Sequence, residues 1–287
     1  MVRWMKEKAH KATLDGDRLH LRWLDPYLRG QELALINRDV IDRLIETRRS
    51  EGVTNATVNR LLEILRAVLR KAEREWEWID RAPIIRMLPE PKRRVRWLSR
   101  EEAEKLLSQL PTHLAAMARF SLATGLREAN VIGLEWSQVD LKRCVAWIHA
   151  DQAKARKPIA VPLNAEAMQV LRAELEKHPR WVFVFKNKRV TKANNHAWRK
   201  ALKRADIENF RWHDLRHTWA SWHVQAGTPL SVLQELGGWE SSEMVRKYAH
   251  LSAEHLAKYS ETIAQPHAVC VPVLQKPKVV TQLRQGA

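Results

Sequence analysis

The sequence has few cysteines and no long apolar segment. Its 287 residues include only two cysteines, Cys144 and Cys270, which lie far apart and in no metal-ligand spacing. This pattern excludes a disulfide framework and a cysteine-based metal site, and it suits a reducing compartment. The N-terminus lacks the apolar core of a signal peptide, and no apolar run is long enough to span a bilayer. We therefore expect a soluble, cytoplasmic protein with no membrane partner.

Acidic residues are scarce relative to basic ones. Lysine and arginine total 50 against 33 for aspartate and glutamate, which leaves a formal net charge of +17. Charge of one sign repels itself, and a polyanion is the usual partner that relieves this repulsion. Hydrophobic residues make up 45% of the chain, enough for a packed core. Nucleic acid is the predicted partner, and a basic surface that serves only solubility is the alternative.

The length predicts two domains, and the first ninety residues are predicted to be helical. Apolar residues recur at helical spacing over 54–76, and a shorter helix is predicted around 40–45. Cationic side chains occupy the other side of the longer helix. We predict that Arg60, Arg66 and Arg70 contact a DNA backbone, whereas a merely solvated face is the alternative.

A basic linker is predicted over 91–98, because prolines between residues 83 and 91 interrupt the helical pattern. Arg93, Arg94 and Arg96 in this segment are candidate DNA contacts. Directly after it, Ser99 and Glu102 have the spacing of a capping box, in which each side chain bonds the other residue's amide. A second domain is therefore predicted to begin at residue 99.

The second domain is predicted to be mainly α with a small antiparallel β-sheet, an α+β fold. Two strands are predicted at 144–149 and 158–163, joined by the polar stretch 150–157, and a third strand at 182–185. A helix is predicted over 194–205. Its apolar side chains face inward, and Arg199, Lys200 and Lys203 face outward as further candidate DNA contacts.

Four short segments of the second domain carry the residues that suggest chemistry. Their order and spacing resemble those of the tyrosine recombinases, specifically the phage-type integrases, over about residues 99–256. The first ninety residues are similar to the helical core-DNA-binding domain of that family. The resemblance implies a catalytic domain over 99–260, and the prolines and weak periodicity of residues 261–287 predict an extended tail. The segments are Ala123-Thr124-Gly125-Leu126-Arg127, Ala153-Lys154-Ala155-Arg156-Lys157-Pro158, His213-Asp214-Leu215-Arg216-His217, and Leu236-Gly237-Gly238-Trp239 followed nine residues later by Tyr248.

The resemblance implies that Arg127 and Arg216 clamp the oxygens of a DNA phosphate. A guanidinium offers paired donors with a permanent charge, which suits the negative charge of a phosphoryl-transfer transition state. Taken singly, each is better explained as an ordinary ion-pair or DNA-backbone arginine. His213 lies three residues before Arg216, so on a helix the two share a face, and an imidazole can relay a proton or donate to a phosphate oxygen.

Lys154 matches the lysine that acts in the family as general acid on the leaving 5′-oxygen. Arg156 and Lys157 are close enough in sequence to leave the choice among the three open. Trp239 stands where many relatives have a second histidine. An indole N–H donates a hydrogen bond but transfers no proton, so a binding and packing role is expected.

Tyr248 matches the nucleophile of the family, and only two other tyrosines occur, Tyr27 and Tyr259. A phenol has a pKa of about 10, so it needs either nearby cations that lower this pKa or a base that takes its proton. Attack would leave a 3′-phosphotyrosine and a free 5′-hydroxyl. The ester keeps the bond energy, so no metal, ATP or other cofactor is expected.

The resemblance also implies partners. These are double-stranded DNA attachment sites, three further copies of the chain in a homotetramer on synapsed DNA, and accessory DNA-bending or directionality factors, all at the nucleoid of a bacterial host. The tail is expected to dock on a neighbouring copy. No additional N-terminal arm-binding domain is evident, so either the chain is shortened or it acts on core sites alone.

One residue departs from the family pattern. Asn130 stands three residues after Arg127, where relatives commonly have an acidic residue that orients the first arginine. A neutral amide can still accept a hydrogen bond from the guanidinium. We therefore expect the orientation of Arg127 to be weakened but kept.

Three rival interpretations remain at this point. His213 and His217 are spaced like the two ligands of a metalloprotease helix, but Asp214 is shorter than the required glutamate and Arg216 would repel a cation. A non-catalytic DNA-binding protein with the same fold would need the cations but no nucleophile. A type IB topoisomerase would use similar residues to relax DNA. The spacing of the lysine and tyrosine segments favours recombination.

Overall fold

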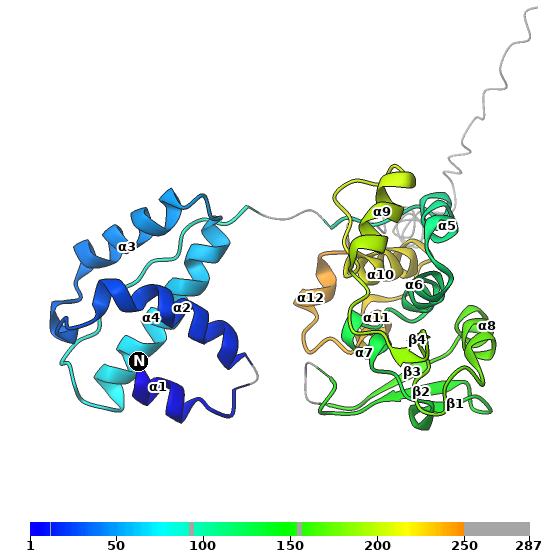
Figure 1. Ribbon diagram of the computed structural model, residues 1–287, viewed down its shortest axis with the longest axis horizontal. Helices are drawn as coiled ribbons and strands as arrows, with labels where there is room; N and C mark the ends of the chain where they lie inside the picture. The colour runs from blue at the N-terminus through cyan, green and yellow to red at the C-terminus, as the bar shows by residue number, and fades with distance from the viewer. Residues whose placement is uncertain (12, 92–94, 154–156, 250–287) are drawn as a thin grey trace, which may run out of the picture. The chain divides into compact units, whose positions relative to one another are not determined.

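The computed structural model of the chain describes residues 1–11, 13–91, 95–153 and 157–249. It divides into two compact units, Met1–Arg93 and Arg94–Ala287, each with its own hydrophobic core. The division falls inside the basic segment in which the sequence predicts a linker. The predicted extended tail over 261–287 lies outside the described residues (Figure 1).

The first unit consists of helices α1 (Val2–Glu7), α2 (Leu14–Leu28), α3 (Arg38–Ser50) and α4 (Asn55–Arg74), with a short 3₁₀ turn at Leu33–Leu35. Helices α2 and α3 both pack on α4 (Figure 1). Thr54 caps α4 by accepting from the amide of Thr57. The helical period predicted from the sequence is confirmed within α4, because its apolar positions there are all buried: Val58, Leu61, Leu62, Leu65, Val68, Leu69 and Ala72. Trp76 is also buried but lies beyond the end of the helix at Arg74.

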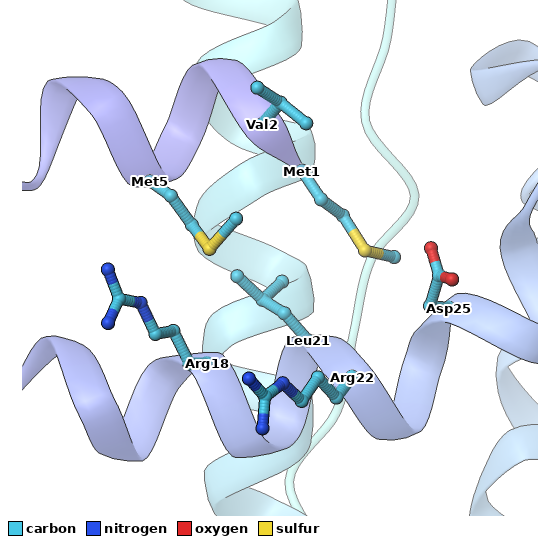
Figure 2. A pocket seen from close by; sticks show the side chains of 7 residues that line it. All are labelled: Met1, Val2, Met5, Arg18, Leu21, Arg22 and Asp25. Carbon is cyan, nitrogen blue, oxygen red and sulfur yellow. The ribbon is translucent and has the colours of Figure 1, made fainter.

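A cavity of about 280 Å³ lies between α1 and α2 of this unit. Figure 2 shows Met1 and Met5 extending toward α2 and Leu21 extending back toward α1. Arg18, Arg22 and Asp25 line its rim. The lining is mostly apolar and holds no group of titratable side chains aimed at one point, so this cavity is not the candidate site.

The second unit contains a helical layer built around α6. Its helices are α5 (Arg100–Gln109), α6 (Thr112–Thr124), α7 (Glu128–Ile132), α8 (Ala165–Glu174), α9 (His196–Arg204), α10 (Asp214–Gln225), α11 (Leu230–Gly237) and α12 (Glu243–Arg246). Helix α6 packs on α10, α8, α7 and α5 (Figure 1). The predicted capping box is confirmed, since Ser99 and Glu102 bond each other's amides. The predicted start of this domain therefore coincides with a real helix start.

The sheet of the second unit has the antiparallel order β1 (Val139–Asp140), β2 (Val145–Ile148) and β3 (Ile159–Pro162). The β2–β3 register pairs Val145 with Pro162 and Ile148 with Ile159, so both predicted strands are confirmed. The third predicted strand is only partly right. β4 (Val184–Phe185) pairs with β5 (Lys188–Arg189) in a separate hairpin, and Val182 and Phe183 are buried in the core instead.

The membrane prediction can be compared with the described helices. None of them is both long enough and apolar enough to cross a bilayer. The fold class is mainly α with small antiparallel sheets, as predicted.

Candidate active site

Helix α10 positions the central arginine of the site. Arg216 lies in its first turn and is 5% exposed. Its Nη1 donates to the carbonyl of Gly125 at 2.6 Å, and its Nη2 donates to the carbonyl of Gly237. These carbonyls belong to the ends of α6 and α11. Three segments that are distant in sequence are therefore tied together by one guanidinium.

The two glycines permit this arrangement because tryptophan rings occupy the space of a side chain. A Cβ on Gly125 would lie 2.3 Å from the ring of Trp219, and a Cβ on Gly237 would lie 2.0 Å from the ring of Trp239. Gly125 also has a φ of +66°, a left-handed conformation that costs other residues about 1–2 kcal/mol. Only glycine lets both carbonyls approach Arg216 while the rings stay in place.

The ring of Trp239 stacks against the guanidinium of Arg216. The Cζ atom of Arg216 lies 4.2 Å from the centre of the Trp239 ring, which stacks on Trp219 with centroids 6.0 Å apart. This geometry adds a cation–π attraction to the two hydrogen bonds. The indole N–H of Trp239 has no hydrogen-bond partner among the described residues. It therefore keeps a donor available for a bound anion.

Tyr248 follows α12 and is fully buried, 0% exposed, among apolar residues that include Trp219 and Trp239. Its Oη lies 2.5 Å from Nδ1 of His217. Burial raises the pKa of the phenol, and this effect outweighs the opposing influence of Arg216. A phenol is activated either by a lowered pKa or by a base that takes its proton, and the pKa of Tyr248 is not lowered. A base in contact with the phenol is present.

The other cations of the site repel one another. Burial and the charge of Arg127, which caps α7, lower the pKa of the Arg216 guanidinium to about 9, so it stays protonated at neutral pH. Burial lowers the pKa of Arg127 as well. Desolvation and then Arg216 lower the pKa of Lys247. Such a cluster favours an anion, since each positive group is stabilised when negative charge enters.

His213 stands at the surface, at the position before α10, with its ring edge-on to His217 at a centroid distance of 5.1 Å. Desolvation by neighbouring protein atoms, followed by the charge of Arg216, lowers the pKa of His213. No group of three or more His, Cys, Asp or Glu side chains in the described ranges is arranged to hold a metal ion. His217 bonds the phenol of Tyr248 rather than sharing a ligand position with His213.

Asn130 forms no hydrogen bond with the guanidinium of Arg127 in the described part of the chain, so the expected hydrogen bond is not present. Its Nδ2 instead donates to the carbonyl of Gln152 at 3.0 Å. Gln138 donates to the side chain of Gln152 and to the carbonyl of Trp147, both at 2.8 Å. These bonds anchor the end of β2 and the residues after it, two positions before Lys154. Lys154 itself, with Arg156, lies outside the described residues.

The candidate DNA contacts differ in how their charges are paired. Arg60 forms a salt bridge to Glu63 at 2.6 Å, and Arg96 forms one to Glu102 at 2.9 Å. Five other candidates form no salt bridge with a described residue: Arg66 and Arg70 on α4, and Arg199, Lys200 and Lys203 on α9. Arg93 and Arg94 lie outside the described residues.

Sequence reasoning missed the role of His217 and of the two glycine carbonyls. The sequence suggested His217 only as a possible metal ligand, whereas its side chain contacts the phenol of Tyr248. The spacing that could have shown this is helical: His217 lies four residues after His213 and so shares its face. The hydrogen bond from Arg216 to Gly237 gives no sequence signal beyond the paired glycines before Trp239.

The comparisons agree with this fold. Residues 96–255 match the phage integrase family. An integrase of Salmonella phage P22 is 41% identical, over 96% of this chain and 82% of the relative. The tyrosine recombinase XerD of Pasteurella multocida is 25% identical, over 90% and 93%. A crystal structure of lambda integrase residues 75–356, a dimer bound to a core site, superposes with a TM-score of 0.72 at 18% identity, over 86% of this chain and 93% of that one.

The fold and these relatives define a tyrosine recombinase, an enzyme of site-specific DNA recombination. Within that class, the chain belongs to the phage integrase family.

Proposed function

We propose that the chain cuts and rejoins double-stranded DNA at attachment sites by transesterification through Tyr248. The phenolic oxygen attacks phosphorus, the P–O5′ bond breaks, and a 3′-phosphotyrosine and a 5′-hydroxyl result. A second 5′-hydroxyl then attacks the phosphotyrosine, and the phenol is released. No metal takes part in either step. The observation that carries the proposal is the meeting of Arg216, Trp239 and Tyr248 beside two histidines in one cationic cluster.

The cluster supports a division of roles around the phosphate. Arg127 and Arg216 neutralise the nonbridging oxygens, and Arg216 has N–H groups left beyond the two that its carbonyl partners use. His213 and the indole N–H of Trp239 donate further hydrogen bonds. Lys154 protonates the leaving 5′-oxygen. Such preorganised donors are worth the most where charge develops in the transition state.

The phenol must become accessible before it reacts, because the Tyr248 side chain is fully buried. The ammonium of Lys247 lies 5.1 Å from the centre of the Tyr248 ring, and the Lys247 side chain is exposed. A DNA phosphate attracts this ammonium, so phosphate entry and the uncovering of the ring occur together. Lys247 is thereby a further candidate contact to the scissile phosphate.

DNA binding and assembly are proposed from the charge and the relatives. A net charge of +17 favours a polyanion, and binding should weaken steeply with salt. The first unit would serve as the core-DNA-binding domain and residues 91–98 as the linker. Structural neighbours include lambda integrase described as a tetramer bound to a Holliday junction, with a TM-score of 0.73. Four copies on two DNA duplexes are accordingly proposed for the synapsed state.

The test uses a nicked suicide duplex, in which the cleaved strand fragment diffuses away and traps the covalent adduct. The parent chain should form a protein–DNA adduct that survives denaturing electrophoresis. Tyr248→Phe should bind the duplex with unchanged affinity and form no adduct. Tyr27→Phe, an exposed tyrosine of the first unit, is the matched control and should react like the parent. An adduct formed by Tyr248→Phe would refute the proposal.

A further inference from the structure

His217 makes a direct contact with the atom proposed to react. Its Nδ1 lies 2.5 Å from Oη of Tyr248, and the two ring centroids are 5.8 Å apart. The imidazole is half-buried on α10, one residue after Arg216. A contact this short places Nδ1 within the range needed for proton transfer.

The protonation states favour the phenol as the donor in this hydrogen bond and Nδ1 of His217 as the acceptor. Burial lowers the pKa of His217 to about 4, with further lowering by Lys247 and His213, so the imidazole is neutral at neutral pH. Burial raises the pKa of Tyr248, so the phenol keeps its proton. A neutral imidazole that accepts at Nδ1 carries its own hydrogen on Nε2. The arrangement is that of an acid with its base in contact.

The charges around His217 explain why the proton stays on the phenol until a phosphate arrives. At the start of α10, His213 before the helix and Arg216 within it disfavour the protonation of His217, and Asp214 favours it. Lys247 disfavours it from the segment after α12. The Asp214 carboxylate is itself bound by Arg211. A phosphate among these cations adds the missing negative charge and makes the imidazole more basic.

We propose that His217 is the general base that takes the proton of Tyr248 as the phenol attacks the phosphate. This inference rests on the proposed function. The Oη–H bond breaks, the proton moves to Nδ1, and the Oη–P bond forms while the P–O5′ bond breaks. Lys154 supplies the proton for the leaving oxygen. On rejoining, the incoming 5′-hydroxyl gives its proton to Lys154, and His217 returns its proton to the phenol.

The test separates proton transfer from positioning by two substitutions at His217. His217→Asn keeps an amide oxygen close to the position of Nδ1, so it can accept the hydrogen bond but not the proton. His217→Ala removes both. His223→Asn is the matched control, because His223 lies on the same helix, is half-buried and also uses Nδ1, toward Thr228 at 3.0 Å. Single-turnover adduct formation on the nicked duplex is measured for each, together with DNA affinity.

We expect both His217 variants to bind DNA like the parent and to form the adduct about 10²–10⁴-fold more slowly. His223→Asn should react at the parent rate. A parent-like rate for His217→Asn would overturn the proposal and leave a positioning role. If the parent itself forms no adduct, the proposed function fails instead, so the two failures are distinguishable.

A second substrate distinguishes the base from the acid. In a duplex with sulfur in place of the bridging 5′-oxygen, the leaving thiolate needs no proton. Lys154→Ala should regain most of its lost rate on this substrate, and His217→Asn should not. Recovery of His217→Asn there would contradict the assignment.

A third measurement uses the parent chain alone, so it does not depend on whether a variant folds. The cleavage rate of the parent should rise with pH through one ionisation between about pH 4 and 8, because the pKa of His217 is about 4 in the chain alone and the bound phosphate raises it. A flat profile over that range would count against the proposal.

Discussion

Each of the two units contains an arginine stacked on a tryptophan, and the two pairs differ in what neutralises the charge. In the first unit, Arg48 lies 5.0 Å from the ring of Trp23, and Glu51 accepts hydrogen bonds from both side chains. In the second unit, Arg216 lies 4.2 Å from the ring of Trp239. Its partners are two neutral carbonyls, and it forms no salt bridge with any described residue.

The difference separates a structural pair from a binding pair. Arg48 is charge-balanced within the protein, so nothing further has to bind to it. Arg216 is buried, and an uncompensated buried charge is costly by several kcal/mol. Hydrogen bonds to carbonyls and a cation–π contact reduce this cost without cancelling the charge. The remaining positive potential is what a phosphate can use.

The largest expected effect comes from changing the arginine in each pair. Arg216→Lys should lower the rate of adduct formation by about 10²–10³-fold, because an ammonium cannot hold two carbonyls and the phosphate with one planar group. Arg48→Lys should leave the rate within about threefold of the parent, since Arg48 pairs with Glu51 inside the first unit, whereas the candidate site belongs to the second. Single-turnover cleavage with matched DNA affinities measures both. Equal losses in the two variants would mean that the pairs do not differ in kind.

Glycine substitutions test the packing of the backbone against the Trp239 ring, which holds the Arg216–Trp239 pair in place. Gly237→Ala should lower the free energy of unfolding of the second unit by about 1–3 kcal/mol, because the new methyl group overlaps the Trp239 ring. Gly16→Ala is the counterpart in α2 of the first unit. No atom lies within 4 Å of its added Cβ, so a gain of about 0.5–1 kcal/mol is expected. Urea unfolding measures both, and an unchanged midpoint for Gly237→Ala would contradict the packing argument.

The two units also differ in how far the sequence predicts them. Helical periodicity located α3 and α4, because the apolar residues of a helix that packs on one side recur at helical spacing in the sequence. The same reasoning located α9, whereas a high content of β-branched and aromatic residues located strands β2 and β3. Periodicity cannot show that β4 pairs with the two residues of β5 rather than with the main sheet. Such short pairings depend on contacts distant in sequence.

For the candidate site, the sequence supplied the residue types but not their contacts. Arg216 and Tyr248 were identified by the resemblance of their segments to those of the recombinase family, whereas the burial that raises the pKa of the phenol follows only from tertiary packing. The hydrogen bond from Tyr248 to His217 joins residues 31 positions apart. The turning of Asn130 toward Gln152 was equally invisible. Partners of this kind are set by the fold rather than by local pattern.

The stability of the chain in acid should depend on His217. Its pKa in the folded chain is about 4, below its ordinary value of 6.5, so the unfolded chain binds this proton more tightly. Stability is therefore present above about pH 6.5 and is lost as the pH falls toward about 4. In His217→Asn this loss should shrink by about 1–2 kcal/mol, a value discounted for partial exposure.

The corresponding histidine of the first unit is His20, whose pKa is lowered by burial and then by Arg48. His20→Asn should reduce the acid loss less than His217→Asn does, because fewer cations act on it. Urea unfolding at pH 4.5 and pH 7 measures both variants against the parent. A larger effect for His20→Asn would mean that burial and neighbouring cations disfavour the protonated histidine more in the first unit than in the second.

The smallest expected effect concerns charges on one face of α4. Arg70 is exposed and forms no salt bridge with a described residue, whereas Arg60 is paired with Glu63. If α4 contacts DNA phosphates, Arg70→Ala should weaken binding about equally for all sequences and reduce the salt dependence, as the slope of log K against log[salt], by about 0.9. Arg60→Ala should change that slope less, since Glu63 already balances part of its charge. Titrations of DNA binding between low and moderate salt measure the two slopes, and identical slopes would show that charge pairing within the first unit does not decide which arginines reach DNA.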